Sequence, residues 1–203
     1  MNTSRLAAAL LAMGLGLALG SQAWAAGPLH DPSVSDLVDA LAGDDDDGPS
    51  ARRLDFRPTA SPEVNTHRCA GSTAEVRAGG RNLVVSYVPD APGVDLALHF
   101  ETGSDRLSAH DRALLDRLAS ALQTDTLRDA RFAIAGHTDA TGSERVNRPL
   151  SCARAIAARE YLIERGVAAD RLTAYGFGSS RPIERHLQES ARNRRVEIRR
   201  GDS

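Results

Sequence analysis

The stretch from Gly136 to Ala155, GHTDATGSERVNRPLSCARA, carries carboxylate, imidazole, hydroxyl, guanidinium and thiol groups close together. It continues a short apolar run, ARFAIAGHT, that is typical of a buried strand, and it leads into a segment whose apolar residues have helical spacing. Ligands collect at such strand-to-helix loops because strand ends, free backbone N–H groups and the positive end of the helix dipole meet there. The stretch is therefore either a catalytic centre or a binding site.

The catalytic interpretation lacks partners for its reactive groups. No motif ties a Ser or Cys nucleophile to His137, and Cys152 has no Cys/His signature around it. The His-Thr-Asp sequence supplies no second metal ligand at a familiar spacing, and the acidic run at 44–47 lacks the alternating oxygen ligands and closing Glu of a calcium loop. We therefore expect no catalytic residue, no metal site and no cofactor, and we interpret His137 as a structural residue of the loop.

Asp139 and Arg154 are the charged residues best placed to hold a ligand. Asp139 lies in the loop, and Arg154 falls on the first or second turn of the next helix, about 60° from the centre of its apolar face. A carboxylate that receives an ammonium and a guanidinium that grips a carboxylate together suit a zwitterionic ligand. The residues alone leave a second interpretation open, in which Asp139 and Arg154 pair with each other and only orient the loop.

Apolar periodicity predicts the elements that position these groups. One helix begins with a capping box at Ser108 and Asp111, and the next ends at Gly166. β-Branched density and alternation predict the strands. The strands are placed at 82–88, 95–100, 130–138, 171–183 with its Gly/Pro turn, and 194–200; the helices are placed at 107–124 and 147–166, with one or two helical turns at 188–193. The order β-α-β-α-β-α-β predicts an α/β (α+β) domain with helices on a small sheet.

The N-terminal part of the chain has a different composition. Residues 1–25 carry one positive charge, an apolar run and an A-x-A site, which predicts a secretory signal peptide. Residues 26–81 are rich in Pro, Gly, Ser and Asp, so we expect a flexible acidic arm that cannot bury enough apolar surface to offset its ordering entropy. A lead-in strand and turn at 82–94 then precede the domain at 95–203.

The net charge bears on the class of binding partner, and the cysteine content bears on whether a disulfide forms. The formal net charge is −2, which is too near neutral to suggest a nucleic-acid partner. Export would bring the chain into an oxidising compartment, where Cys69 and Cys152 can form a disulfide. In the chain-entropy model this bond would stabilise the fold by roughly 4 to 5 kcal/mol. The sequence leaves open whether the two sulfurs meet.

Four motifs in this order and spacing resemble the OmpA-like peptidoglycan-binding domain family, which includes the C-terminal domains of OmpA, MotB and Pal. They are GHTDATG, NRPLSCARA, YGFGSSRPI and NRRVEI, with a further match at FETGSDRL, and the similarity covers about residues 96–200. The resemblance implies helices packed on a small mixed sheet. It also implies non-covalent binding of the peptidoglycan stem peptide, chiefly through meso-diaminopimelate.

The resemblance also implies roles for individual residues. Asp139 would receive the ammonium of the ligand, and Arg154 would take its carboxylate. Asn147 would precede the second helix, Thr138 would offer a hydroxyl beside Asp139, and Arg194 would lie at the rim of the site. The family pattern is broken in the first turn, where Glu101 and Gly103 stand in place of the Asp and Asn of many members, so the resemblance does not assign a ligand contact to this turn.

The implied function is to tether a periplasmic protein to the cell wall. We expect the N-terminal arm to bind an envelope protein, and this partner would associate the chain with the outer membrane. Two alternatives remain. A stator or secretion-system anchor would retain residues 1–25 as a membrane helix, although this run has the features of a cleaved signal. A cell-wall hydrolase would need a nucleophile or a set of metal ligands, which the motifs do not supply.

Overall fold

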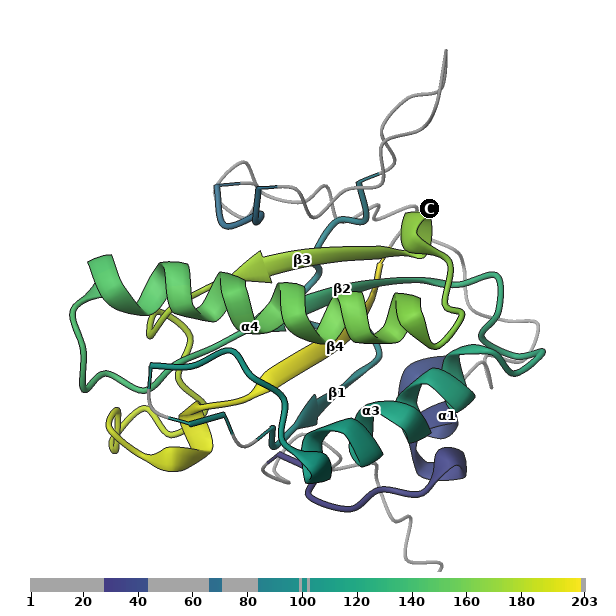
Figure 1. The fold of residues 1–203 in the computed structure, drawn as a ribbon, viewed down its shortest axis with the longest axis horizontal. Helices are drawn as coiled ribbons and strands as arrows, with labels where there is room; N and C mark the ends of the chain where they lie inside the picture. Colours follow the sequence, from purple (N-terminus) through teal and green to yellow (C-terminus); the bar gives the residue numbers. More distant parts are fainter. Residues whose placement is uncertain (1–27, 44–65, 71–83, 99, 102, 202–203) are drawn as a thin grey trace, which may run out of the picture.

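The computed structural model describes residues 28–43, 66–70, 84–98, 100–101 and 103–201, and these contain a four-stranded mixed sheet (Figure 1). The strands are β1 (Gly93–Leu96), β2 (Arg131–Gly136), β3 (Leu172–Gly176) and β4 (Val196–Gly201), in the spatial order β1-β4-β2-β3. β2 and β3 are parallel, whereas β4 runs antiparallel to both β1 and β2. The predicted fold class, helices on a small mixed sheet, is confirmed.

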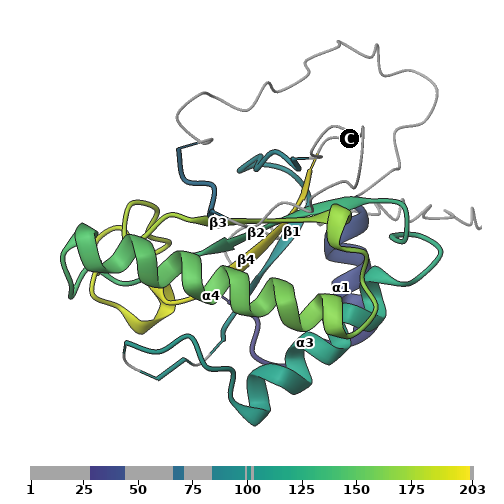
Figure 2. The ribbon, with the colours of Figure 1, turned by 45° about the horizontal axis from the view of Figure 1, so that its top comes forward.

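Helices α3 (Ala109–Leu122) and α4 (Glu144–Glu164) cover one face of the sheet (Figure 2). Two short 3₁₀ helices, η2 (Ala169–Arg171) and η3 (Ala191–Asn193), precede β3 and β4. The other face, which we call the helix-free face because none of the described helices covers it, carries a small, largely aromatic hydrophobic cluster. Its members are Tyr87, Ala133, Ala135, Tyr175 and Phe177.

Strand directions bring three loops to one end of the sheet. Because β1, β2 and β3 all point the same way and β4 points the opposite way, the segments 97–104, 137–143 and 177–195 gather at that end. This is the left-hand end of the sheet in Figure 1, where β3 ends and α4 begins. The topology thus brings GHTDATG, YGFGSSRPI and NRR together.

Two glycines at this end let α4 lie directly against the sheet. A Cβ on Gly136 would stand 2.1 Å from the carbonyl oxygen of Ser151, and one on Gly176 would stand 2.6 Å from Sγ of Cys152. Real Cβ atoms do not approach backbone this closely, so the two strand ends require glycine. The close approach also lets the hydroxyl of Ser151 accept a hydrogen bond from the backbone N–H of Gly178 (2.9 Å).

Several predicted boundaries are wrong. Helix α4 begins at Glu144 and carries Pro149 inside it, so Asn147 lies in its first turn and Arg154 lies in its third. A proline this near the N-terminus removes only one helical hydrogen bond, which the helix tolerates. The predicted strand 95–100 is shortened and shifted to 93–96, and the described part of the predicted strand 82–88 crosses the helix-free face without joining the sheet.

Part of the predicted flexible arm is packed into the domain. Residues Val34–Ala42 form helix α1, which begins with a capping box between Ser33 and Asp36 and buries Leu37 and Leu41 completely in the main core beside α3. The two buried leucines and the capped N-terminus contribute to offsetting the ordering entropy of this short helix. The prediction of a loose arm is therefore wrong for this segment.

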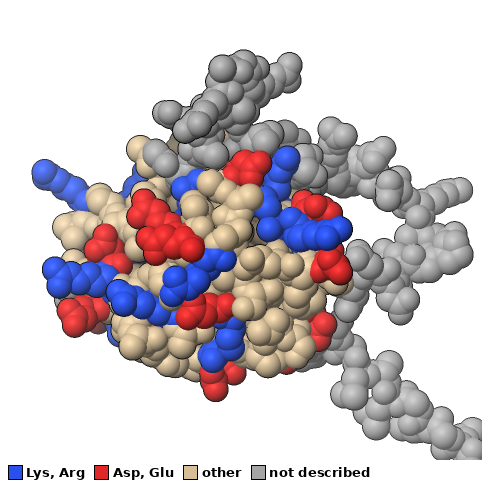
Figure 3. Space-filling model, turned by 45° about the vertical axis from the view of Figure 1, so that its right-hand side comes forward, with Lys and Arg blue, Asp and Glu red and all other residues tan. Residues whose placement is uncertain are grey.

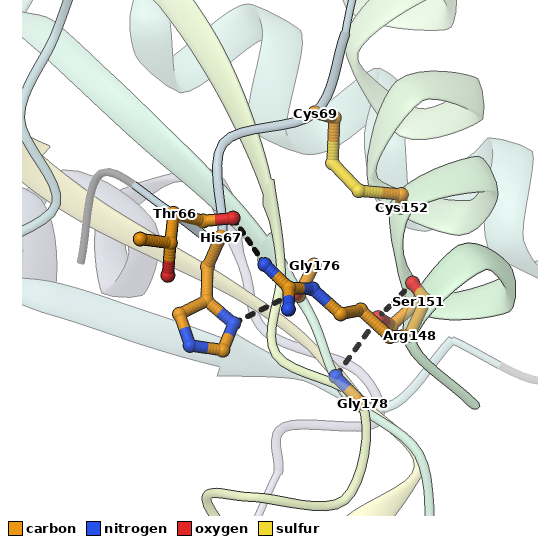
Figure 4. Close-up of a disulfide and its surroundings, with 8 residues drawn as sticks. All are labelled: Thr66, His67, Cys69, Arg148, Ser151, Cys152, Gly176 and Gly178. Atoms are coloured by element: carbon orange, nitrogen blue, oxygen red, sulfur yellow. Dashed lines mark hydrogen bonds between the residues drawn. A yellow bond between two sulfur atoms is a disulfide. The ribbon is translucent and has the colours of Figure 1, made fainter. Parts of the chain in front are cut away.

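A second part of the arm, around Cys69, is attached to β3 at the edge of the sheet (Figure 4). The backbone N–H of Cys69 donates to Ala174 of β3 (3.0 Å), and that of Gly176 donates to the carbonyl of His67 (2.9 Å). Cys69 and Cys152 form a disulfide that ties this segment to α4. The disulfide that the sequence left open is thus present in the structure.

The predicted signal peptide and the acidic run 44–47 lie outside the described residues. Within the described parts of the chain, no helix is both long and apolar enough to cross a bilayer.

Candidate functional site

Asp139 is the best-connected side chain of the β2–α4 loop. It is 6% exposed, and its Oδ1 accepts hydrogen bonds from both the backbone N–H (3.1 Å) and the hydroxyl of Thr141. Its Oδ2 forms an ion pair with Nη1 of Arg194 at 2.7 Å. Burial raises the pKa of Asp139, but the bonds from Thr141 and Arg194 outweigh it, so the pKa lies below its ordinary value. Asp139 is a carboxylate at neutral pH.

Asn147 and Thr138 shape this loop. The side-chain amide of Asn147, which is 5% exposed, donates to the carbonyls of Asp139 (3.1 Å) and Gly142 (2.9 Å) and so closes the loop onto the first turn of α4. The backbone N–H of Thr138 donates to Gly178 (2.9 Å). Its hydroxyl is buried and has no hydrogen-bond partner among the described residues. Both residues therefore position Asp139 through the backbone.

Arg154 projects from α4 toward the segment after β1. Its Nε donates to the carbonyl of Ser104 (3.1 Å), its Nη2 donates to that of Glu101 (3.2 Å), and its guanidinium lies over the ring of Phe100, 4.9 Å from the centroid. The contacts at 101–104 are made by backbone carbonyls, so they do not depend on the side chains that break the family pattern. These contacts fix the orientation of the Arg154 guanidinium. Its Nη1 takes part in neither of the two hydrogen bonds.

Burial lowers the pKa of Arg154, and the neighbouring Arg194 lowers it further, whereas Asp139 and Asp105 raise it. Arginine nonetheless keeps its proton in proteins, so Arg154 remains a cation although its side chain is only 4% exposed. Arg194, rather than Arg154, is the ion-pair partner of Asp139. The interpretation in which Asp139 and Arg154 pair with each other is therefore wrong.

A cavity of about 160 Å³ opens in front of Arg154. Its walls include Phe100 and Arg194, and also Pro28 and His30 from the N-terminal segment. Asp139 does not line the cavity itself, but it is the ion-pair partner of Arg194, which does. The predicted residues Asp139, Arg154 and Arg194 thus share one site, with Asn147 and Thr138 supporting it from the loop.

Asn193, which is fully buried, was missed by the sequence interpretation. Its side-chain amide donates to the carbonyls of Leu187 and Gln188 (both 3.0 Å), and its Oδ1 accepts from the backbone N–H of Glu184 (3.1 Å). These bonds fold the segment before β4 so that Arg194 reaches the site. The NRR motif marked the arginines, but nothing in the sequence showed that the asparagine holds the segment.

A buried charge cluster lies near the site on the helix-free face of the sheet. Glu197, 3% exposed, pairs with Arg195 (3.4 Å) and Arg199 (2.5 Å), and it accepts a hydrogen bond from Nε2 of His137 (2.8 Å). Burial lowers the pKa of His137, and Arg195 adds to this, so the imidazole is neutral at neutral pH. The strand was predicted to be half exposed, but both faces of it are covered. His137 is structural in this arrangement, as expected from the sequence.

Charge on the outer surface is mixed. On the face that Figure 3 brings forward, arginine and acidic side chains are interspersed, without a broad area of one sign. Within the described residues, no group of three or more His, Cys, Asp or Glu side chains is arranged to hold a metal ion.

Comparison with known proteins identifies the family of the segment that carries the candidate site. The OmpA family matches residues 99–195, which contain all five predicted site residues. These residues form a domain of the OmpA family. Peptidoglycan-binding protein ArfA of Mycobacterium tuberculosis is 46% identical over 90 residues, which is 43% of this chain and 27% of the relative. Outer membrane protein A of Shigella flexneri is 31% identical over 124 residues, 57% of this chain and 36% of the relative.

The OmpA-family domain here is a small part of those relatives. The chain spans about a quarter of ArfA (27%), so the comparison concerns this domain and not the whole relative. Among solved structures, the cell wall anchor of the type VI secretion system from Pseudomonas aeruginosa is similar with a TM-score of 0.46 and 30% identity, over 58% of this chain and 87% of that one. Helix α1 and the Cys69 segment lie outside the family match.

Proposed function

We propose that this OmpA-family domain binds peptidoglycan without breaking any bond, through the diaminopimelate of the stem peptide. The observation that carries the proposal is the buried, pre-oriented guanidinium of Arg154 in a cavity whose wall also includes Arg194, the ion-pair partner of the Asp139 carboxylate. The relative ArfA, which is named as a peptidoglycan-binding protein, supports the same ligand.

Each end of an amino-acid head group has a partner in the site. Two of the Arg154 donors are used by backbone carbonyls, so the Nη1 side is left to take a carboxylate in a charge-assisted bond. Asp139 receives the ammonium on Oδ2, where Arg194 is at present its partner. Arg194 then shares Asp139 with the ligand or turns toward the ligand carboxylate. Because the guanidinium is already ordered, binding loses little side-chain entropy.

We further propose that residues 1–25 direct export to the periplasm and that the domain tethers the protein to the cell wall there. The remainder of the N-terminal arm would contact an envelope protein, which provides a link to the outer membrane. The alternative of a retained membrane helix falls within residues 1–27, outside the described part of the chain.

A pull-down with purified peptidoglycan tests the proposal. Wild-type protein should sediment with sacculi, and the double variant with Asp139→Ala and Arg154→Ala should remain in the supernatant. The matched control is Asp125→Ala, Arg128→Ala, which removes an exposed Asp–Arg pair elsewhere on the domain and should sediment normally. Arg154→Lys, which keeps the charge but loses the planar fork, should bind more weakly than wild type while melting at a similar temperature. Undiminished sedimentation of the double variant would refute the assigned site.

A further inference from the structure

A second groove, separate from the cavity described above, lies on the helix-free face of the sheet. Its walls come from Tyr87, in the segment that crosses this face, and from Arg181 and Arg185, in the loop that follows β3. None of its lining residues also lines the cavity. Successive side chains of an extended backbone point in opposite directions, so Arg194 lines the cavity whereas Arg195 lines the groove.

Arg181 is held over the aromatic cluster of this face. Its guanidinium lies 4.6 Å from the ring centroid of Phe177 and 5.3 Å from that of Tyr87. The backbone carbonyl of Arg181 accepts a hydrogen bond from Nη1 of Arg195 (3.2 Å). The hydroxyl of Ser180 donates to the carbonyl of Phe177 (2.6 Å), which closes the preceding turn. Contact with the rings uses no hydrogen-bond acceptor, so the side chain is ordered while its N–H donors stay available.

The charge of Arg181 and Arg185 is not balanced within the described residues. Neither guanidinium donates a hydrogen bond or forms an ion pair there. Glu197 also lines the groove, but it is 3% exposed and belongs to the buried charge cluster. In that cluster the carboxylates of Glu197 and Asp95 are matched by two buried arginines. The groove therefore offers two guanidiniums that still lack an anionic partner.

We propose that this groove binds an acidic segment of a partner protein, whose carboxylates pair with Arg181 and Arg185. Charge complementarity carries the choice of partner, because an unpaired arginine in a groove favours a carboxylate in a charge-assisted bond. The side-chain amide of Gln188, which is exposed and lines the groove, can bond the backbone of the bound segment. Several separate contact points along an open groove suit an extended segment with more than one carboxylate. The inference does not depend on the proposed function.

Other occupants fit the groove less well. Attraction to an anionic membrane takes clusters of about four to eight basic residues, and the groove offers two unpaired arginines. A second copy of the chain, packed about a twofold axis through the groove, would place the same arginines against each other. The net charge of −2 disfavours a nucleic acid.

Fluorescence anisotropy of two labelled peptides with the exported chain tests the inference. The probes are the octapeptide amide (Glu-Gly)4 and its neutral analogue (Gln-Gly)4. Wild-type protein should bind the acidic probe about tenfold more tightly or better. Arg181→Ala and Arg185→Ala should each weaken it about fivefold or more, because each removes one charge-assisted contact. Arg181→Lys keeps the charge but loses the planar fork, so its affinity should lie between those of wild type and Arg181→Ala.

The matched control is Arg145→Ala, which removes an exposed arginine of α4 outside the groove and should bind the acidic probe like wild type. Thermal melting of each variant checks the fold, and Arg185 is exposed, so its replacement should leave the melting temperature unchanged. Equal affinities for both probes, or full binding by Arg181→Ala and Arg185→Ala, would overturn the inference. Loss of binding in Arg154→Ala alone would also overturn it, because the probe would then enter the cavity.

The same variants separate this site from the proposed function and from the other occupants. Arg185→Ala should sediment with sacculi like wild type, so failure of the peptide experiment leaves peptidoglycan binding standing. Probe binding that appears only after the four aspartates at 44–47 are replaced by Asn would assign the groove to the chain's own acidic run and overturn the inference. Arg185-dependent sedimentation with phosphatidylglycerol vesicles, or an Arg185-dependent dimer in sedimentation velocity, without binding of the acidic probe, would overturn it in favour of a membrane or a second copy.

Discussion

Loss of the Cys69–Cys152 disulfide should destabilise the domain strongly. The bond closes a loop with a sequence separation of 83 residues. In the chain-entropy model, a cross-link over that length removes entropy from the unfolded chain worth about 4.5 kcal/mol at 25 °C. Typical domains are stable by only ~5–15 kcal/mol, so this one bond supplies a large share of the total.

The native contacts around the bond suggest where the loss is felt first. Cys69 is 3% exposed, and its segment is held to β3 by the backbone bonds of Cys69 and Gly176 and to α4 by a hydrogen bond from Arg148 to the carbonyl of Thr66 (Figure 4). These few bonds lie at the sheet edge. Without the covalent tie, the segment Thr66–Ala70 should open before the rest of the sheet.

Urea unfolding of the wild type, with and without a phosphine reductant, measures the effect. The free energy of unfolding should fall by about 4 to 5 kcal/mol on reduction. The double variant with Cys69→Ala and Cys152→Ala should have a stability close to that of the reduced wild type. The double variant is also the control, because reductant should not change its unfolding curve. Hydrogen exchange should show early loss of protection at the N–H groups of Cys69 and Gly176. A loss below about 1 kcal/mol would refute the entropic reasoning, since it would mean that the reduced unfolded chain is already constrained.

Three further perturbations have defined outcomes. Gly176→Ala places a Cβ 2.6 Å from Sγ of Cys152 and 2.7 Å from its backbone nitrogen, so chemical denaturation should show a loss of about 1 to 3 kcal/mol or more; unchanged stability would contradict the close approach of α4. Asn193→Ala removes three hydrogen bonds to backbone and should cost about 2 to 3 kcal/mol, with weaker peptidoglycan binding because Arg194 is released; full binding would show that Arg194 is held by other means. Burial raises the pKa of Glu197, but its bonds to His137, Arg199 and Arg195 outweigh this and lower the pKa from 4.5 to about 2. Because the folded pKa is depressed, this stabilisation is complete above pH 4.5 and is lost as the pH falls toward 2; Glu197→Gln should flatten that part of the stability profile, and an unchanged slope would contradict the assignment.

The position of the candidate site residues was largely predictable from local sequence. Asp139 and Arg154 were marked by chemistry and by the family motifs, and strand topology then brought the GHTDATG and NRR segments to one end of the sheet. The start of α4 was misplaced because Pro149 favours a helix start, whereas here the helix accommodates it. Arg194 was assigned to the rim, but its ion pair with Asp139 depends on a segment folded around the buried Asn193.

By itself the sequence determined the fold class, the order of strands and helices and the types of charged group in the β2–α4 loop, because apolar periodicity, capping residues and turn residues act over short distances along the chain. Only the tertiary structure decided which arginine pairs with Asp139, that Cys69 meets Cys152, and that Pro28–Asp31 and α1 are packed onto the domain. These contacts join residues far apart in sequence, such as Leu29 with Ala97 and Arg148 with Thr66. Their free energy comes from burial and from hydrogen bonds that exist only once the sheet has formed, so no local pattern encodes them.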